Sequence, residues 1–216
     1  MKTLRIILVV ALAALVVCPT ELQAKKKNKV DIYELSLEDN IEEPEIRDEK
    51  HSQRIQNYQY RVAVELKKQG YEVELMRDNE VIVVTLQAGT LFGPNSTEMT
   101  DLGKKSLSPL NKYLSNPGFY KMLLVMHSDN TGSSAYTLEL TRNRVNAVFD
   151  WMERVTSVDF VVPYALGATD PVEENNSMEN RRHNRRLEVY LVPGDVMLSQ
   201  AKKGEVDINL LSGKNK

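Results

Sequence analysis

The residues of this chain that are best suited to chemistry are a carboxylate and a guanidinium on either side of a turn. Asp129 follows the apolar run of residues 122–126 and opens the sequence Asp-Asn-Thr-Gly. The run is typical of a buried strand, and the four residues after it are typical of the turn that leaves such a strand. Asp129 therefore places a carboxylate at the end of a strand.

The guanidinium belongs to Arg144, in a segment with the period of an amphipathic helix. Between residues 136 and 155, apolar side chains recur at steps of three and four, namely Tyr136, Leu140, Ala147, Val148, Trp151, Met152 and Val155. Arg144 falls inside this apolar stripe, where a permanently charged group needs an anion. Only a short loop joins strand and helix, so Asp129 and Arg144 should border one site.

Two interpretations of this pair follow from the residues alone. A ligand that carries an ammonium and a carboxylate on the same carbon could engage both side chains. Alternatively, Asp129 and Arg144 form an internal ion pair in a purely structural protein, or Arg144 extends along the surface to solvent.

Catalysis and metal binding have less support. The chain contains only three histidines, His51, His127 and His183, and no metal-ligand cluster surrounds them. An enzymatic interpretation would use His127, Asp129 and a nearby serine. His127 and Asp129 could also bind a metal together, but the sequence shows no third ligand for it. We therefore expect no enzymatic activity, no metal and no cofactor.

Four motifs in order resemble one known family, with residues 127–144 taken as one motif in two parts. The segments 127–132 and 136–144 resemble G-H-T-D-x-x-G and Y-N-x-x-L-S-x-x-R-A of the OmpA-like family, the peptidoglycan-binding domain at the C-terminus of outer-membrane protein A. The further resemblances are Leu91-Phe92 with residues 96–103, residues 167–171, and residues 180–188. Together they cover residues 80–193, about half of the chain.

The resemblance implies a non-catalytic binding site. In the family, the turn aspartate and the helix arginine hold the ammonium and carboxylate of diaminopimelate in the peptidoglycan stem peptide, and these roles fall on Asp129 and Arg144. The resemblance also assigns Asn95, Asn130 and Thr137 to the site. Thr137 replaces the asparagine that is usual there, so a hydroxyl stands in place of an amide.

Periodicity and resemblance together predict an α+β fold: an OmpA-like βαβαββ-type mixed sheet with helices packed on one face. A helix over residues 55–66 and a hairpin of residues 71–75 and 81–86 precede this core. Pro109 should kink or divide the first core helix. Residues 187–192 alternate and should form the last strand.

Composition predicts an exported protein with several segments. Residues 1–24 contain an apolar run of about 12 residues, too short for a membrane span of about 20, and end in Leu-Gln-Ala like a signal peptide. Cys18 is the only cysteine, and Val17 before it disfavours lipidation. The expected segments are a signal peptide (1–24), a charged linker (25–50), a helix plus hairpin extension (51–86), the OmpA-like domain (87–193) and a polar tail (194–216).

Charge argues against a nucleic-acid partner. The net charge is −2, and removal of Lys2, Arg5 and Glu21 with the signal peptide makes it −3. The basic cluster Arg181, Arg182, Arg185 and Arg186 is interpreted as a solvated helix end paired with local acids.

We therefore expect a periplasmic, envelope-associated protein that binds the peptidoglycan stem peptide, and whose N-terminal segment could contact outer-membrane or envelope proteins. The alternative is an assembly protein of the envelope that keeps the fold without binding peptidoglycan.

Overall fold

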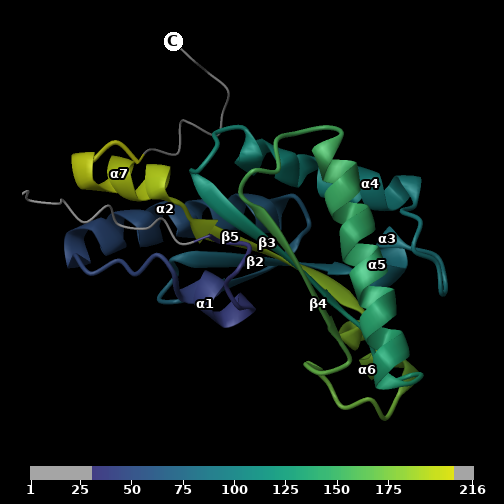
Figure 1. Cartoon of the computed structure of the whole chain (residues 1–216). Coiled ribbons are helices and arrows are strands. Elements are labelled where there is room, and N and C mark those ends of the chain that lie inside the picture. Colours follow the sequence, from purple (N-terminus) through teal and green to yellow (C-terminus); the bar gives the residue numbers. More distant parts are fainter. Residues whose placement is uncertain (1–30, 207–216) are drawn as a thin grey trace, which may run out of the picture. The chain divides into compact units, whose positions relative to one another are not determined.

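A mixed sheet surrounded by helices forms the part of the chain that the structure describes, residues 31–206 of a computed structural model (Figure 1). The elements, in chain order, are α1 (Leu37–Glu42), α2 (Glu49–Lys68), β1 (Glu72–Met76), β2 (Val81–Gln87), α3 (Ala88–Leu91), α4 (Asp101–Leu107), the 3₁₀ helix η1 (Ser108–Leu114), β3 (Tyr120–His127), α5 (Ser134–Glu153), β4 (Val161–Gly167), α6 (Met178–Asn184), β5 (Arg186–Pro193) and α7 (Asp195–Lys203).

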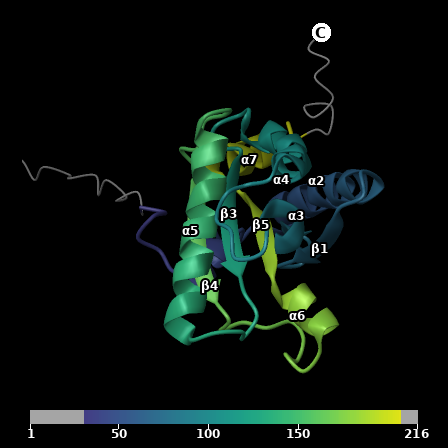
Figure 2. The ribbon, with the colours of Figure 1, turned by 90° about the vertical axis from the view of Figure 1, so that its right-hand side faces the viewer.

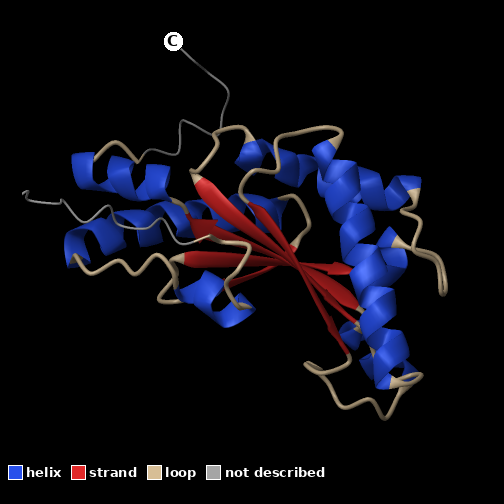
Figure 3. Ribbon diagram, in the orientation of Figure 1, coloured by secondary structure: helices blue, strands red, loops and turns tan. Residues whose placement is uncertain are grey.

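Within residues 31–206, the sheet has five strands in the order β1-β2-β5-β3-β4. In this sheet β3 and β4 run parallel, and the other neighbouring strands run antiparallel. The strands fan out across the sheet with the twist that is usual for L-amino acids (Figure 3). The last strand thus occupies the centre, and β3 and β5 are buried along their whole length. The mixed α+β fold agrees with the sequence prediction.

Helices pack on the first face of the sheet around the larger core. Figure 2 shows α5 alongside β3 and β4, with α2 and α7 farther along the sheet. Their apolar side chains meet those that alternate inward from the strands, including Ile82, Val84, Met122, Leu124, Val189 and Leu191. Pro109 lies where α4 changes into η1, which confirms that it divides the first core helix.

The second face of the sheet is covered by residues 31–44, which we call the N-terminal strap. Ile32, Leu37 and Ile41 pack on apolar side chains of this face, namely Val81, Val83, Leu123, Val125, Val162, Tyr190 and Val192. The sequence pointed to a charged linker here and to helices on one face only, whereas α1 and the strap occupy the other face (Figure 1).

Polar side chains of the sheet hold the backbone of the strap. Arg77 donates hydrogen bonds to the carbonyls of Ile41, Glu42 and Pro44, and Lys121 donates to Glu43 O at 2.7 Å. Asn40, fully buried, donates to Ile32 O and to Tyr164 Oη. These contacts explain how a segment rich in charge can pack on an apolar face.

The C-terminal part differs from the polar tail that the sequence suggested. Residues 195–203 form α7, which buries Met197 and Ala201 and packs against α2. The expected signal peptide, Cys18 and the end of the expected polar tail, residues 207–216, lie outside the described residues. Within residues 31–206, none of the helices combines the length and apolar character needed to span a bilayer.

Candidate functional site

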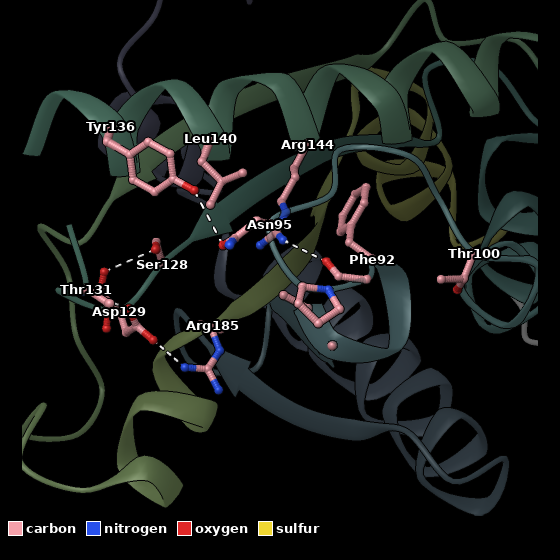
Figure 4. A pocket seen from close by; sticks show the side chains of 14 residues that line it. Phe92, Asn95, Thr100, Ser128, Asp129, Thr131, Tyr136, Leu140, Arg144 and Arg185 are labelled. Atoms are coloured by element: carbon pink, nitrogen blue, oxygen red, sulfur yellow. Dashed lines mark hydrogen bonds and ion pairs between the residues drawn. The ribbon is translucent and has the colours of Figure 1, made fainter. Parts of the chain in front are cut away.

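A pocket of about 460 Å³ lies where β3 ends, between α5 and the chain that joins α3 to α4 (Figure 4). Its lining combines one carboxylate and two guanidiniums with an apolar and aromatic wall. The lining residues are Ala88, Gly89, Phe92, Gly93, Pro94, Asn95, Thr100, Ser128, Asp129, Thr131, Tyr136, Leu140, Arg144 and Arg185. The structure therefore brings together Asp129, Arg144 and Asn95, three of the five site residues expected from the sequence.

Asp129 is fixed in its ionised form at the bottom of the turn after β3. The backbone N–H of Thr131 donates to Asp129 Oδ1 at 2.8 Å, and Arg185 Nη1 donates to Asp129 Oδ2. Burial alone would raise the pKa of Asp129, but the hydrogen bonds from Thr131 and Arg185 lower it below its ordinary value. The site thus presents a carboxylate that is charged at neutral pH.

Arg144 is buried and serves as a support for the loop that follows α3. Its Nε donates to Ser96 O at 2.9 Å and its Nη2 donates to Gly93 O at 3.3 Å. The guanidinium also lies over the ring of Phe92, 5.1 Å from its centroid. Burial lowers the pKa of Arg144, yet a guanidinium remains protonated at neutral pH.

The charge of Arg144 has no carboxylate partner within 4.0 Å among residues 31–206. The two carbonyls occupy the Nε side of the guanidinium. The opposite edge, formed by Nη1 and the second N–H of Nη2, remains available for a carboxylate in a two-bond arrangement. The internal ion pair between Asp129 and Arg144, the alternative interpretation from the sequence, is therefore not the arrangement that the structure shows.

Tyr136 and Asn95 lie on opposite walls of the pocket. Tyr136 Oη donates to Asn95 Oδ1 at 3.4 Å, so α5 and the loop after α3 are joined across the cavity (Figure 4). Tyr136, Leu140 and Arg144 are spaced four residues apart on α5 and all line the pocket. The first half of the apolar stripe thus lines the site, and Thr137 and Thr141 take the core positions beside it.

The other two expected site residues do not line the pocket. Thr137 is buried in α5, where its hydroxyl donates to Ser134 O at 3.1 Å. Asn130 is exposed, and its backbone N–H donates to Asn175 Oδ1 at 3.3 Å. Asn130 and Thr137 therefore shape the neighbouring turn and helix in this structure.

The sequence interpretation missed Arg185. The four arginines of residues 181–186 were expected to form a solvated helix end, but only Arg182 fits, through its pair with Glu179. Arg185 reaches the pocket and pairs with Asp129, whereas Arg186 is buried and pairs with Glu188 at 2.7 Å. The neighbouring side chains of Arg185 and Arg186 have different partners because the chain changes from helix α6 to strand β5 here, and successive side chains of a strand point in opposite directions.

A buried charged network lies beside the pocket, around His127, the last residue of β3. His127 Nε2 lies 3.3 Å from Glu188 Oε2, and Tyr190 Oη donates to the same oxygen at 2.7 Å. Arg186 binds the other oxygen of Glu188 and also approaches Asp170 at 3.5 Å. No group of three potential metal ligands occurs in the described part of the chain. The network joins β3, β5 and the loop after β4.

This network predicts a specific loss of stability in acid. Burial alone would raise the pKa of Glu188, but the hydrogen bond and charge of His127, with Tyr190 and Arg186, lower it from 4.5 to about 2. A carboxyl group with a lowered pKa in the folded state stabilises the fold above its ordinary pKa. That contribution is lost as the pH falls from 4.5 through about 2.

Thermal unfolding of the wild type and Glu188→Gln, followed between pH 7 and pH 2, measures this effect. The difference in Tm between the two proteins should be largest at neutral pH and should shrink below pH 4.5. A difference that stays constant down to pH 2 would show that the carboxylate charge is not the stabilising group.

Comparison with known proteins identifies the domain that contains the pocket. Residues 91–185 match the sequence profile described as the OmpA family. This segment belongs to the OmpA family. The match includes Asp129, Arg144 and Arg185 and begins after α2 and the β1–β2 hairpin. This agrees with the family that the sequence motifs suggested.

Two curated relatives give the extent of the similarity. The chain is 21% identical over 128 residues to the probable lipoprotein YiaD of Escherichia coli (strain K12), which is 59% of this chain and 58% of that protein. It is 33% identical over 66 residues to the peptidoglycan-binding protein ArfA of Mycobacterium tuberculosis (strain ATCC 25618 / H37Rv), which is 30% of this chain and 20% of that protein. The chain therefore spans less than two thirds of the length of either relative.

Solved structures share the fold. A putative MotB-like protein from Desulfovibrio vulgaris superposes with a TM-score of 0.57 at 21% identity, over 65% of this chain and 94% of that one. The cell wall anchor of the T6SS from Pseudomonas aeruginosa superposes with a TM-score of 0.51 at 26% identity, over 64% of this chain and 96% of that one.

Proposed function

We propose that the OmpA-family domain binds peptidoglycan by its diaminopimelate-containing stem peptide, without catalysis. The observation that carries this proposal is the pairing of two opposite charges in one pocket. Asp129 offers a fixed carboxylate, and Arg144 offers a buried guanidinium with one free edge. An amino-acid head group needs an acceptor for its ammonium and a fork of donors for its carboxylate.

The comparisons support the same ligand at a coarser level. ArfA is a peptidoglycan-binding protein by name, and a similar solved structure is a cell wall anchor. Free diaminopimelate head groups recur along the wall polymer, so a site that selects only the head group suits a repetitive surface. The apolar wall of Phe92, Tyr136 and Leu140 provides a surface for the methylene chain that carries the head group.

We further propose that the protein is exported to the periplasm, where the wall lies, and that residues 1–24 are removed. The intact mass of the periplasmic form would then lack those residues. A mass that includes Met1 would contradict export by this signal, and a lipid-modified Cys18 would indicate an outer-membrane anchor.

Sedimentation with isolated walls tests the proposed function. The purified protein should co-sediment with walls that contain diaminopimelate and remain in solution with walls that contain lysine at the same position. Asp129→Ala should reduce the bound fraction, whereas Arg142→Ala, an exposed arginine on the outer face of α5, should not. Equal binding of Asp129→Ala and wild type would favour the envelope-assembly alternative.

A further inference from the structure

A second cavity of about 530 Å³ lies outside the site described above, between the β1–β2 hairpin and α4. It is lined by Gln69, Gly70, Tyr71, Glu72, Thr85, Leu86, Gln87, Thr90, Leu102, Lys105, Ser106 and Pro109. Residues 69–87 precede the part of the chain that matches the OmpA family. The cavity is therefore built jointly by the extension of this chain and by the first helices of the domain.

The chemistry of this cavity differs from that of the charged pocket. Its lining carries two amides, three aliphatic hydroxyls and a single pair of opposite charges, Glu72 and Lys105. An ionic head group would meet both signs of charge there, whereas an uncharged ligand with hydroxyl and amide groups would find donors and acceptors. Leu102, with 62% of its surface exposed, adds an aliphatic side chain at the edge of the cavity.

One lining group is left without a partner. The side-chain oxygen of Gln87 is buried and accepts no hydrogen bond from any residue that the structure describes. Most buried polar atoms in proteins are paired, so an unpaired amide oxygen beside a cavity indicates a missing donor. An acetamido N–H or a hydroxyl of a ligand could supply that donor after a small rotation of the amide.

The second cavity is next to the first pocket, because residues that are adjacent in the chain line the two. Gln87 and Thr90 line the second cavity, whereas Ala88 and Gly89, between them in the chain, line the first. At the start of α4, Thr100 lines the first cavity and Leu102 the second. Residues in and beside α3 and at the start of α4 thus line both cavities, and the two cavities are neighbours in the fold.

From this lining and position, we infer that the second cavity is a subsite for an N-acetylated sugar of the wall glycan. The inference rests on the proposed function, since the stem peptide would occupy the first pocket and the sugar chain the second. The hydrogen bond from Tyr71 Oη to Ser106 O at 2.7 Å ties the extension to α4 and gives the cavity a fixed wall. The extension would then add glycan recognition to a peptide-binding domain.

Titration of the full chain with a tetramer of N-acetylglucosamine, followed by calorimetry and NMR, tests this subsite. Binding should be detected, with shifts at residues around Gln87 and Thr90, and a glucose tetramer without acetamido groups should bind more weakly. Gln87→Leu should weaken binding of the acetylated tetramer by about 2- to 10-fold, the loss of one hydrogen bond. Gln53→Leu, an exposed glutamine on α2, serves as the matched control and should bind like wild type.

The variant Asp129→Ala distinguishes failure of the sugar subsite from failure of the proposed peptide site. It should leave binding of the sugar tetramer unchanged while it weakens binding of a diaminopimelate peptide. The absence of sugar binding by wild type, equal affinity of Gln87→Leu and wild type, or equal affinity for both tetramers would overturn the subsite. Shifts around Gln87 caused by a sugar-free stem peptide in Asp129→Ala would instead assign the cavity to peptide.

Discussion

Arg144→Ala is expected to weaken binding of a diaminopimelate-containing stem peptide by about 10- to 150-fold, since each charged hydrogen bond contributes roughly 1.5–3 kcal/mol. Arg144→Lys should restore little of this loss. The guanidinium uses one side for the carbonyls of Gly93 and Ser96 and keeps another edge for the ligand, whereas a lysine ammonium cannot present two parallel donors.

Calorimetric titration of both variants with a stem tripeptide measures the effect. Arg142→Ala, on the exposed face of the same helix, is the matched control and should bind like wild type. Melting curves are needed beside the titrations, because Arg144 also supports the loop after α3. Wild-type affinity in a folded Arg144→Ala protein would remove Arg144 from the site.

Gly194→Ala is expected to destabilise the fold by roughly 3 kcal/mol or more, a large part of the stability of a typical domain. A Cβ at this position would lie 2.2 Å from Gly118 O and 2.9 Å from Gly118 C. Both atoms belong to the backbone, which is fixed because Gly194 N–H donates to Phe119 O and Val196 N–H donates to Gly118 O.

Urea unfolding of Gly194→Ala measures this change, with Gly89→Ala as the comparison. A Cβ at Gly89 meets nothing within 4 Å, and Gly89 lies in helix α3, where alanine is favoured over glycine. Gly89→Ala should therefore unfold at or slightly above the wild-type midpoint. A wild-type midpoint for Gly194→Ala would mean that the end of β5 can move away from β3.

The parts of the site that are local in sequence could be predicted from it. Asp129 and Arg144 are joined by one turn and the first turns of a helix, so the order of strand, turn and helix already brings them together. The same reasoning could not find Arg185, which reaches Asp129 from 56 residues farther along the chain. Its partner depends on the sheet order, in which β5 pairs with β3, and no local pattern specifies that order.

The strap was missed for a related reason. Ile32, Leu37 and Ile41 are spread among acidic residues without a regular period, so composition suggested a linker. What holds the segment is Arg77 and Lys121, whose donors bind its backbone carbonyls. Backbone acceptors are the same for every residue type, and sequence alone therefore gives no sign of such contacts.

Removing the charges of the ligand one at a time tests most directly whether Asp129 and Arg144 bind the ammonium and the carboxylate of diaminopimelate. Affinities of wild type and Asp129→Ala should be measured for three stem tripeptides: one with a free diaminopimelate head group, one with its amine acetylated, and one with its carboxylate amidated. The same set should be measured for Arg144→Ala.

If Asp129 holds the ammonium, Asp129→Ala should strongly weaken binding of the peptide with the free head group. The same change should alter affinity for the acetylated peptide by no more than about 2-fold, since the ammonium partner of Asp129 is already absent there. Arg144→Ala should weaken binding of the free and the acetylated peptides, but it should leave affinity for the amidated peptide nearly unchanged. If each mutation causes the same loss with all three peptides, Asp129 and Arg144 do not contact the head group and the proposed clamp is wrong.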